Sequence, residues 1–415
     1  MKVFIKNIRR LYGVHSQEVR KIAGKQMAEL PFIENAWLAV EDGIIAAFGS
    51  MEDYLGIEDW RNLEIIDAED RYVLPGFCDS HSHAVFAQSR ADEFVDRIHG
   101  LSYEDIAKRG GGILNSAAKL GAMTEQELYD AAFERLNLLM SQGTVAIEIK
   151  SGYGLDAENE LKMLRVIQRL KESHPIQVKR TFLALHALPL EFKDSADHYV
   201  RMMIDEVLPV VAKEGLADYV DAFCEDGYFT VEQMNDLIEA AQRFGIPAKL
   251  HVNQFTILGA VKAACERNAV SVDHLEELND DDIDALLKSE TMPVALPACS
   301  FFLRIPYTPA RRLVEAGLPF ALASDFNPGS SPTGNMQFVG SLACIQMRML
   351  PEEVINASTL NGAYAMNLEQ ELGSITIGKR ASFILTKPMK SISELFYYFA
   401  DAGVEQVFVD GKKVN

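Results

Sequence analysis

Short apolar segments of strand length alternate with amphipathic helical segments through the middle of this 415-residue chain. The strand candidates are the apolar run 72–77 and residues 145–149, 178–185, 219–223, 248–251, 270–274, 294–296 and 320–323. Helical periodicity lies between them, for example at residues 157–173, 231–244 and 280–288. Eight such units predict an α/β protein with a (β/α)8 TIM-type barrel, in which catalytic groups gather at the carboxyl ends of the strands. A doubly wound open sheet is the alternative fold.

The two ends of the chain have a different pattern. Residues 37–40 and 44–48 are strand-like around a turn at 41–43, residues 381–385 and 404–409 also resemble strands, and Asp410-Gly411 is a hairpin turn signal. We therefore expect residues 1–72 and 371–415 to form one small β-sandwich domain. Residues 73–370 are then the barrel domain.

Composition excludes several classes of partner. A formal net charge of -20 disfavours nucleic acid and anionic membrane surfaces, which attract clusters of Lys and Arg. We find no signal peptide at the N-terminus and no uncharged apolar run of membrane-spanning length. The cysteines are odd in number and widely separated, as expected of reduced thiols, which favours a cytoplasmic protein: Cys78, Cys224, Cys265, Cys299 and Cys344.

The pair His81 and His83 follows the apolar run 72–77. Successive side chains of a strand point to opposite faces, so two histidines one residue apart leave on the same side and can bind one metal ion. Later apolar segments end in His251 and Asp325, which completes a nitrogen and oxygen ligand set for a hydrolytic metal. Asp325 could instead simply open the turn Asn327-Pro328-Gly329.

In a barrel, the unusual polar residues would collect at one rim. The strand-end residues are His81, His83, Lys150, His186, Glu225, His251, His274 and Asp325. This pattern favours a metal site over independently placed histidines. The other histidines, His15, His99, His174 and His198, lie in loops or polar stretches and are expected at the surface. Lys150 ends the second strand, an unfavourable position for a carbamylated bridge between two metals, so we expect one metal and a structural or electrostatic role for Lys150.

Several motifs resemble those of the amidohydrolase superfamily and, within it, the imidazolonepropionases. They are PGFCDSHSHAVFAQSRADEF, SYEDIAKRGGGI, EIKSGYGL, TFLALHALP, KLHVNQF, SVDHLEEL and ASDFNPGSSPTGN, and the resemblance covers almost the whole chain. It implies hydrolysis of the cyclic amide ring of 4-imidazolone-5-propanoate, a small-molecule substrate, to N-formimidoyl-L-glutamate in histidine degradation. It also implies a homodimer.

The resemblance assigns roles to individual positions. It makes His81, His83, His251 and Asp325 the ligands of one Zn²⁺ or Fe³⁺ per chain. For catalysis we infer that His186 and His274 polarise the ring oxygen or transfer a proton, in roles that could be exchanged, and that Asp325 moves the water's proton to the leaving nitrogen. The resemblance assigns substrate contacts to Arg90, Tyr103, Tyr153, His186, Gln254, Asn327, Gly329 and Ser330. A guanidinium and hydroxyl or backbone donors suit the carboxylate of a propanoate. Taken singly, Arg90 could be a surface ion-pair residue, Tyr153 a core residue and Gly329 a plain turn residue.

Two positions depart from the pattern. Some similar sequences have Glu three residues after the third metal-binding His, where this chain has Gln254, and an amide cannot take up a proton. The base is then Asp325 or His274. The segment Ala381-Ser382-Phe383 also differs from the usual Asp-Leu after Ala, but it falls in the predicted sheet domain.

Two other functions stay open. The first is hydrolysis or deamination of a different ring, such as a nucleobase or a hydantoin, although the SGYG and NPGSSP segments fit a carboxylate tail better. The second is a catalytically silent metal- or ligand-binding scaffold. The intact ligand set and the two extra histidines argue against a scaffold, whereas Gln254 is consistent with one.

Overall fold

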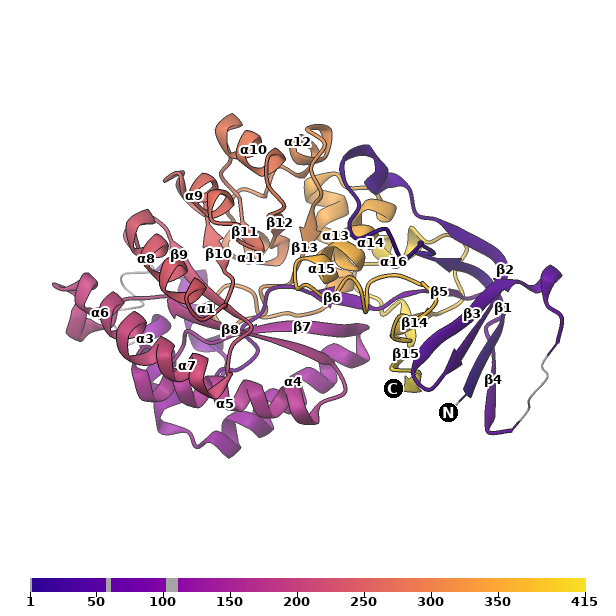
Figure 1. Cartoon of the computed structure of the whole chain (residues 1–415), viewed down its shortest axis with the longest axis horizontal. Helices are drawn as coiled ribbons and strands as arrows, with labels where there is room; N and C mark the ends of the chain where they lie inside the picture. Colours follow the sequence, from indigo (N-terminus) through magenta and orange to yellow (C-terminus); the bar gives the residue numbers. More distant parts are fainter. Residues whose placement is uncertain (1, 57–60, 102–110) are drawn as a thin grey trace.

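The structure, a computed structural model, describes residues 2–56, 61–101 and 111–415. It contains two sheets of eight strands, one in the middle of the chain and one formed by both termini. Figure 1 shows the barrel beside the terminal sheet, with both chain ends at the terminal sheet. The predicted division into a barrel and a sheet built from both termini is thus confirmed.

The barrel strands follow one another in chain order, and each pairs in parallel with the next. They are β6 (Phe77–Asp79), β7 (Thr144–Lys150), β8 (Gln177–Leu185), β9 (Tyr219–Cys224), β10 (Lys249–Val252), β11 (Ser271–His274), β12 (Met292–Ala295) and β13 (Ala321–Leu322). The strand order never reverses, so the doubly wound alternative is wrong. The ring closes just beyond β6 and β13, where Asp325 N donates to His81 O at 2.9 Å and His83 N donates to Phe326 O at 2.8 Å.

Helices surround this barrel and extend the chain after it (Figure 1). They are α1 (Ala91–Ile98), α3 (Gly112–Ala122), α4 (Glu125–Ser141), α5 (Ala157–Ser173), α6 (Ala196–Met202), α7 (Leu208–Glu214), α8 (Val231–Gln242), α9 (Ala260–Glu266), α10 (Asp280–Leu287), α11 (Pro297–Leu303), α12 (Ala310–Glu315), α13 (Met336–Met347), α14 (Pro351–Ser358), α15 (Leu360–Tyr364) and α16 (Glu394–Tyr397). The predicted helices at 157–173, 231–244 and 280–288 correspond to α5, α8 and α10.

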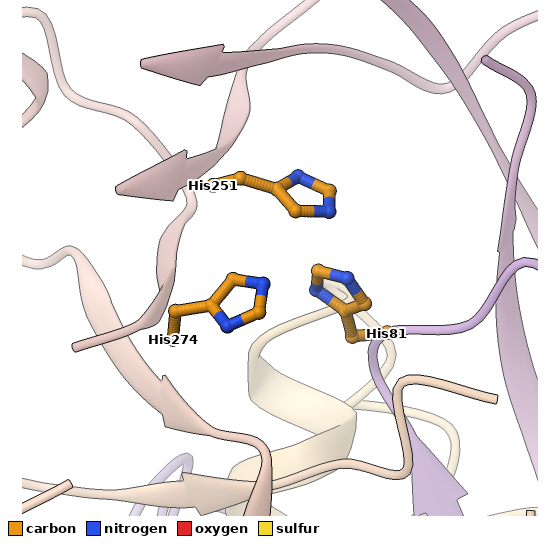
Figure 2. Close-up of side chains that lie close together, drawn as sticks. All are labelled: His81, His251 and His274. Atoms are coloured by element: carbon orange, nitrogen blue, oxygen red, sulfur yellow. The ribbon is translucent and has the colours of Figure 1, made fainter. Parts of the chain in front are cut away.

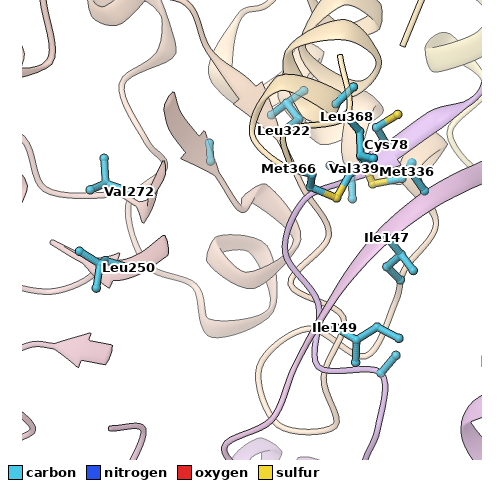
Figure 3. Close-up of a cluster of buried hydrophobic side chains, with 14 of the residues drawn as sticks. Cys78, Ile147, Ile149, Leu250, Val272, Leu322, Met336, Val339, Met366 and Leu368 are labelled. Carbon is cyan, nitrogen blue, oxygen red and sulfur yellow. The ribbon is translucent and has the colours of Figure 1, made fainter. Parts of the chain in front are cut away.

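The barrel strands separate apolar from polar side chains because successive residues of a strand face opposite sides. On β7, Ile147 and Ile149 join the large apolar core, part of which Figure 3 shows. Glu148 and Lys150 alternate with them and meet charged side chains of other strands inside the barrel. The interior of the barrel is therefore polar directly below the predicted site.

The terminal sheet consists of strands β1 (Lys2–Tyr12), β2 (Phe32–Glu41), β3 (Ile44–Ser50), β4 (Leu63–Asp67), β5 (Tyr72–Pro75), β14 (Phe383–Thr386), β15 (Val404–Val409) and β16 (Lys412–Lys413). Strand β5 joins the two termini, since it pairs with β1 on one side and with β14 on the other. The sheet has an apolar core of its own, in which Phe383 stacks on Phe408 with ring centroids 4.7 Å apart.

The chain crosses from the terminal sheet to the barrel at Gly76. A Cβ atom at this position would lie 2.3 Å from Val145 Cγ1, so the crossing requires glycine. The apolar run 72–77 is therefore two strands in two sheets, and residues 72–75 lie in the terminal sheet. We accordingly propose Gly76 as the domain boundary instead of residue 72, and keep the boundary at 370 as a prediction.

One of the histidines expected at the surface is buried. His174, directly after α5, is 6% exposed, and its ring lies edge-on to that of Phe133 at 4.8 Å. The prediction that His174 lies at the surface was therefore wrong, because α4 packs against α5 and covers this residue.

Candidate active site

The predicted metal-binding residues come together at the carboxyl ends of the barrel strands. His81 and His83 follow β6, His251 lies in β10 and Asp325 follows β13, and all four side chains are buried. His274 ends β11 beside them. Figure 2 shows the rings of His81, His251 and His274 turned toward one another, with the His81 and His251 centroids 4.4 Å apart.

Nitrogen and oxygen atoms in this cluster are close enough to bind one cation. Ligand atoms of His81, His83 and Asp325 lie within 4.8 Å of one another, as do those of His81, His251 and His274. The Asp325 Oδ1 atom is 3.6 Å from His81 Nε2 and 3.5 Å from His83 Nε2. His81 Nε2 is buried without a hydrogen-bond partner among the described residues. A cation at this point would satisfy it, so the residues fit a metal ion.

Two aspartates lie behind the histidines. Asp273 Oδ2 lies 2.6 Å from His81 Nδ1, and Asp221 Oδ2 lies 2.8 Å from His251 Nδ1. The Asp273 contact is a hydrogen bond, and a carboxylate at one ring nitrogen directs the other nitrogen toward the metal and makes it a better ligand. The Asp221 contact with the His251 ring lacks hydrogen-bond geometry, but Asp221 Oδ1 accepts a hydrogen bond from the backbone N of His251 at 3.1 Å. Our sequence analysis missed both aspartates. The signal was present, because each is a charged residue inside an otherwise apolar strand segment.

Burial keeps the clustered imidazoles in the state that binds metals. It lowers the pKa of His81, His83 and His251 well below the ordinary value, with further lowering from Lys150 for His81 and His251 and from His186 for His83. Neutral rings with free lone pairs are thus maintained at neutral pH. Burial also raises the pKa of the Asp325 carboxyl to about 6, against the opposing charge of His274.

His274 differs from the other histidines. Burial by itself would lower its pKa, but the charge of Glu276, a contact between His274 Nδ1 and Glu276 Oε1 at 3.4 Å, and the charges of Asp325 and Asp273 raise it overall. The backbone of His274 has φ 89° and that of Asp325 has φ 52°, both unusual for residues with side chains. Such strained backbones are often found at active sites.

His186 follows β8 and is held by a backbone group. Its Nδ1 atom lies 2.7 Å from the carbonyl oxygen of Gly152. Burial lowers the pKa of His186 to about 4, so the ring is neutral at pH 7. Its ring stacks on that of His83, with centroids 5.5 Å apart.

A cavity of about 360 Å³ opens above the cluster. Its lining includes His83, Arg90, Tyr153, His186, His251, Gln254, His274, Asp325, Asn327, Gly329 and Ser330. His81 lies deeper, and Tyr103 is outside the described residues. The remaining predicted site residues therefore meet at one cavity.

The polar side chains that line this cavity differ in how many of their donors and acceptors already have a partner within the protein. Asn327 Oδ1 accepts from Gly329 N and Ser330 N, both at 2.8 Å, and its Nδ2 donates to Asp325 O at 2.7 Å, so this amide shapes the turn. Arg90 Nε donates to Ser116 Oγ at 2.9 Å, which fixes the guanidinium. Gln254 Nε2 lies 3.5 Å from Cys299 Sγ.

The other two strand-end residues are not part of the cavity lining. Lys150 Nζ lies inside the barrel, 2.8 Å from Asp221 Oδ2. Glu225 Oε2 accepts from Phe255 N at 2.8 Å and so stabilises the loop after β10.

Comparison with known proteins places this arrangement in a family. The model of the amidohydrolase family matches residues 72–414. The chain is 53% identical over 412 residues to the imidazolonepropionase of Flavobacterium johnsoniae, covering 99% of this chain and all of the relative. The chain belongs to the amidohydrolase family and, within it, to the imidazolonepropionases. It is also 52% identical to the imidazolonepropionase of Christiangramia forsetii, over the full length of both chains, and 42% identical to that of Clostridium tetani, over 94% of this chain and 93% of the relative.

Solved structures of other proteins share the fold of this imidazolonepropionase family member. E. coli guanine deaminase superposes with a TM-score of 0.76 at 14% identity, covering 100% of this chain and 99% of that one. A zinc-bound adenosine deaminase from Xanthomonas campestris gives a TM-score of 0.72 at 16% identity, covering 99% and 92%. At these identities the likeness concerns the fold alone.

Two further observations concern the cysteines and the helices. All five cysteines are free. Among the helices in the described part of the chain, none has the length and apolarity needed to cross a bilayer.

Proposed function

We propose that this chain hydrolyses the cyclic amide ring of 4-imidazolone-5-propanoate to N-formimidoyl-L-glutamate, a step of histidine degradation. The observation that carries the proposal is the convergence of the family's residues on one cavity in a chain that matches imidazolonepropionases over their full length. Water adds to the ring carbonyl carbon, the bond from that carbon to the ring nitrogen breaks, and the nitrogen takes up a proton.

One metal ion per chain, Zn²⁺ or Fe³⁺, completes the proposed site. His81, His83, His251 and Asp325 would hold it, since their nitrogen and oxygen atoms suit either ion. When bound, such an ion lowers the pKa of a coordinated water and polarises a carbonyl group.

Three side chains would handle protons around the ring. Asp325, which lines the cavity, takes the proton of the attacking water and delivers it to the leaving nitrogen. His274, with its raised pKa, donates a hydrogen bond to the ring carbonyl oxygen. His186 accepts a hydrogen bond from a ring N–H at its Nε2 atom, because Nδ1 is engaged by Gly152. Gln254 orients the ring, since an amide cannot act as a base.

The propanoate tail would bind at the other end of the cavity. The Arg90 guanidinium next to Gly329 offers a forked cation for the carboxylate, and Tyr153 and Ser330 add polar contacts. A nucleobase has no carboxylate for Arg90, which favours the imidazolone over a base as substrate. Tyr103 remains a proposed substrate contact.

The test is turnover of freshly generated 4-imidazolone-5-propanoate, followed by the loss of its ultraviolet absorbance, with metal-loaded protein. We expect rapid loss with wild type and near-complete loss of activity in Asp325→Ala and His274→Ala. The exposed His198→Ala serves as the control and should keep full activity. If a fully metal-loaded wild type does not turn the compound over, the proposal is wrong, and other cyclic amides and nucleobases are the substrates to assay next.

We also propose that the enzyme works in the cytoplasm as a homodimer. Five free cysteines suit a reducing compartment, and the dimer rests on the family resemblance. Sedimentation velocity would test the dimer, and a monomer at micromolar concentration would contradict it.

A further inference from the structure

Among the described residues, five charged side chains form one connected set of ion pairs inside the barrel below the histidines. They are Glu148 and Lys150 of β7, Asp221 of β9, Lys249 of β10 and Asp273 of β11, and each is 0% exposed. Ions cost several kcal/mol to bury unless they are paired, so an arrangement of five requires close mutual contacts. The geometry of these contacts links Lys150 to the candidate metal site.

The Lys150 ammonium is shared among three carboxylates. Its Nζ atom lies 2.8 Å from Glu148 Oε1, 2.8 Å from Asp221 Oδ2 and 3.6 Å from Asp273 Oδ2. The same two aspartate oxygens face the histidines, Asp221 Oδ2 at 2.8 Å from His251 Nδ1 and Asp273 Oδ2 at 2.6 Å from His81 Nδ1. The Lys150 ammonium therefore contacts both carboxylates that lie against the histidine rings.

We propose that Lys150 is a positioning residue for the metal site, which fixes His81 and His251 by holding Asp273 and Asp221 in place. The inference rests on the proposed function, because it assumes that these histidines bind the metal. Without the ammonium, two buried carboxylates would repel each other, and either could turn away from its histidine. His81 would then lose the hydrogen-bonded partner that sets its ring orientation, and His251 would lose the carboxylate that accepts from its backbone N–H and lies against its ring.

A competing effect acts in the opposite direction. Lys150 carries a positive charge near the site of a metal cation, so its removal would relieve Coulomb repulsion and strengthen metal binding. The two effects predict opposite signs for Lys150→Met. Loss of outer partners of metal ligands typically weakens metal affinity 10- to 100-fold. We expect the orienting effect to dominate, because both aspartates are direct neighbours of the ammonium.

Lys249 provides a matched control. It is equally buried, and its Nζ atom lies 3.2 Å from Glu148 Oε2, 2.8 Å from Ser271 Oγ and 2.8 Å from Ala365 O. Lys249→Met thus removes the same charge from the same barrel interior, but from a side chain that forms no direct ion pair with Asp221 or Asp273 among the described residues. Lys249 reaches Asp273 only through Ser271 Oγ, which donates to Asp273 Oδ1 at 2.5 Å. A general effect of charge or stability would affect both variants alike.

The experiment measures affinity for Zn²⁺ and Co²⁺ by competition with a chelator, and the visible spectrum of the Co²⁺ form, all without substrate. We expect Lys150→Met to weaken affinity about 10- to 100-fold and to alter the Co²⁺ spectrum, and Lys249→Met to change each far less. Equal effects in the two variants, or unchanged or tighter binding in Lys150→Met, would overturn the inference.

Double variants give a second measurement. If Lys150 acts through the aspartates, the loss of metal affinity in the double variant Lys150→Met with Asp221→Asn should be smaller than the sum of the losses in the two single variants. The same should hold for Lys150→Met with Asp273→Asn. Additive effects in both pairs would contradict the proposal. The double variant Lys150→Met with Asp221→Asn removes opposite charges together. Should Lys150→Met alone fail to fold, the double variant is compared with Asp221→Asn alone: we expect a further loss of metal affinity through Asp273, and equal affinity would contradict the proposal. A wild type that takes up neither ion would overturn the metal site itself and this inference with it.

Discussion

The Nδ1 atom of His186 lies 2.7 Å from the carbonyl oxygen of Gly152, an atom that can only accept a hydrogen bond. The hydrogen therefore sits on Nδ1, and the Nε2 atom faces the cavity with a lone pair. Since burial lowers the pKa of His186 to about 4, the ring keeps this state at neutral pH. His186 is thus an acceptor, whereas His274 with its raised pKa is a donor.

We predict that His186 in the zinc-loaded protein is the Nδ1–H tautomer at pH 7. Long-range ¹H–¹⁵N correlation spectra would show this, with the signal assigned by its absence in His186→Gln. Activity should fall on the order of 10²-fold or more in His186→Ala, as expected when a group in proton handling is lost. His186→Gln should lose less because its amide oxygen can accept. A Nε2–H tautomer would contradict the assignment.

Glu276→Gln should change the pH dependence of turnover. Glu276 raises the pKa of His274, so its neutralisation lowers that pKa. The donor form of His274 is lost as pH rises through its pKa, and the alkaline limb of the kcat/KM profile should therefore move to lower pH. Glu277→Gln, one residue along the chain, is the control and should leave the limb near its wild-type position. A limb that moves to higher pH in Glu276→Gln would exclude His274 as the donor.

Gly329→Ala should weaken substrate binding. A Cβ atom at this position would lie 2.5 Å from Arg90 Nη1, so the guanidinium must move. We expect KM to rise about tenfold or more, with kcat changed far less, since a hydrogen bond to a charged group contributes roughly 1.5 kcal/mol or more. Gly121→Ala in α3 adds the same methyl group outside the cavity lining. Unchanged KM in Gly329→Ala would argue against Arg90 as the carboxylate site.

His174 should make the fold sensitive to acid. Ile176 N donates to His174 Nδ1 at 3.2 Å, so protonation of that nitrogen breaks the bond. Burial lowers the pKa of His174 from 6.5 to about 4, so the unfolded chain binds the proton more strongly. The associated loss of stability begins as pH falls below 6.5 and is complete once pH is below about 4.

The measurement compares urea unfolding midpoints at pH 7.5 and 5.0 for wild type, His174→Gln and the exposed-site control His198→Gln. His174→Gln cannot gain this charge, so its midpoint should fall less between the two pH values than that of wild type. Acid effects on the metal site are common to all three proteins and cancel in the comparison. Equal shifts in wild type and His174→Gln would refute the prediction.

Much of the fold followed from local pattern. The strand candidate 145–149 became β7 and the candidate 219–223 became β9, because apolar segments between helices have few other ways to be buried. The division of the run 72–77 between two sheets could not be predicted from the local pattern. This division at Gly76 depends on β5 finding β14, more than 300 residues later, and on Val145 leaving no space for a side chain.

The candidate site likewise has features that the sequence predicts and features that it does not. Sequence by itself determined that His81, His83, His251, His274 and Asp325 reach one rim, because parallel strands in a barrel deliver their carboxyl ends to the same side. Only the tertiary structure decided that Asp273 hydrogen-bonds to the His81 ring, that Asp221 lies against His251 and that Lys150 contacts both aspartates. A strand's two-residue period fixes the face on which a side chain lies, but the partner of each nitrogen depends on the register of neighbouring strands and on packing between residues far apart in the chain.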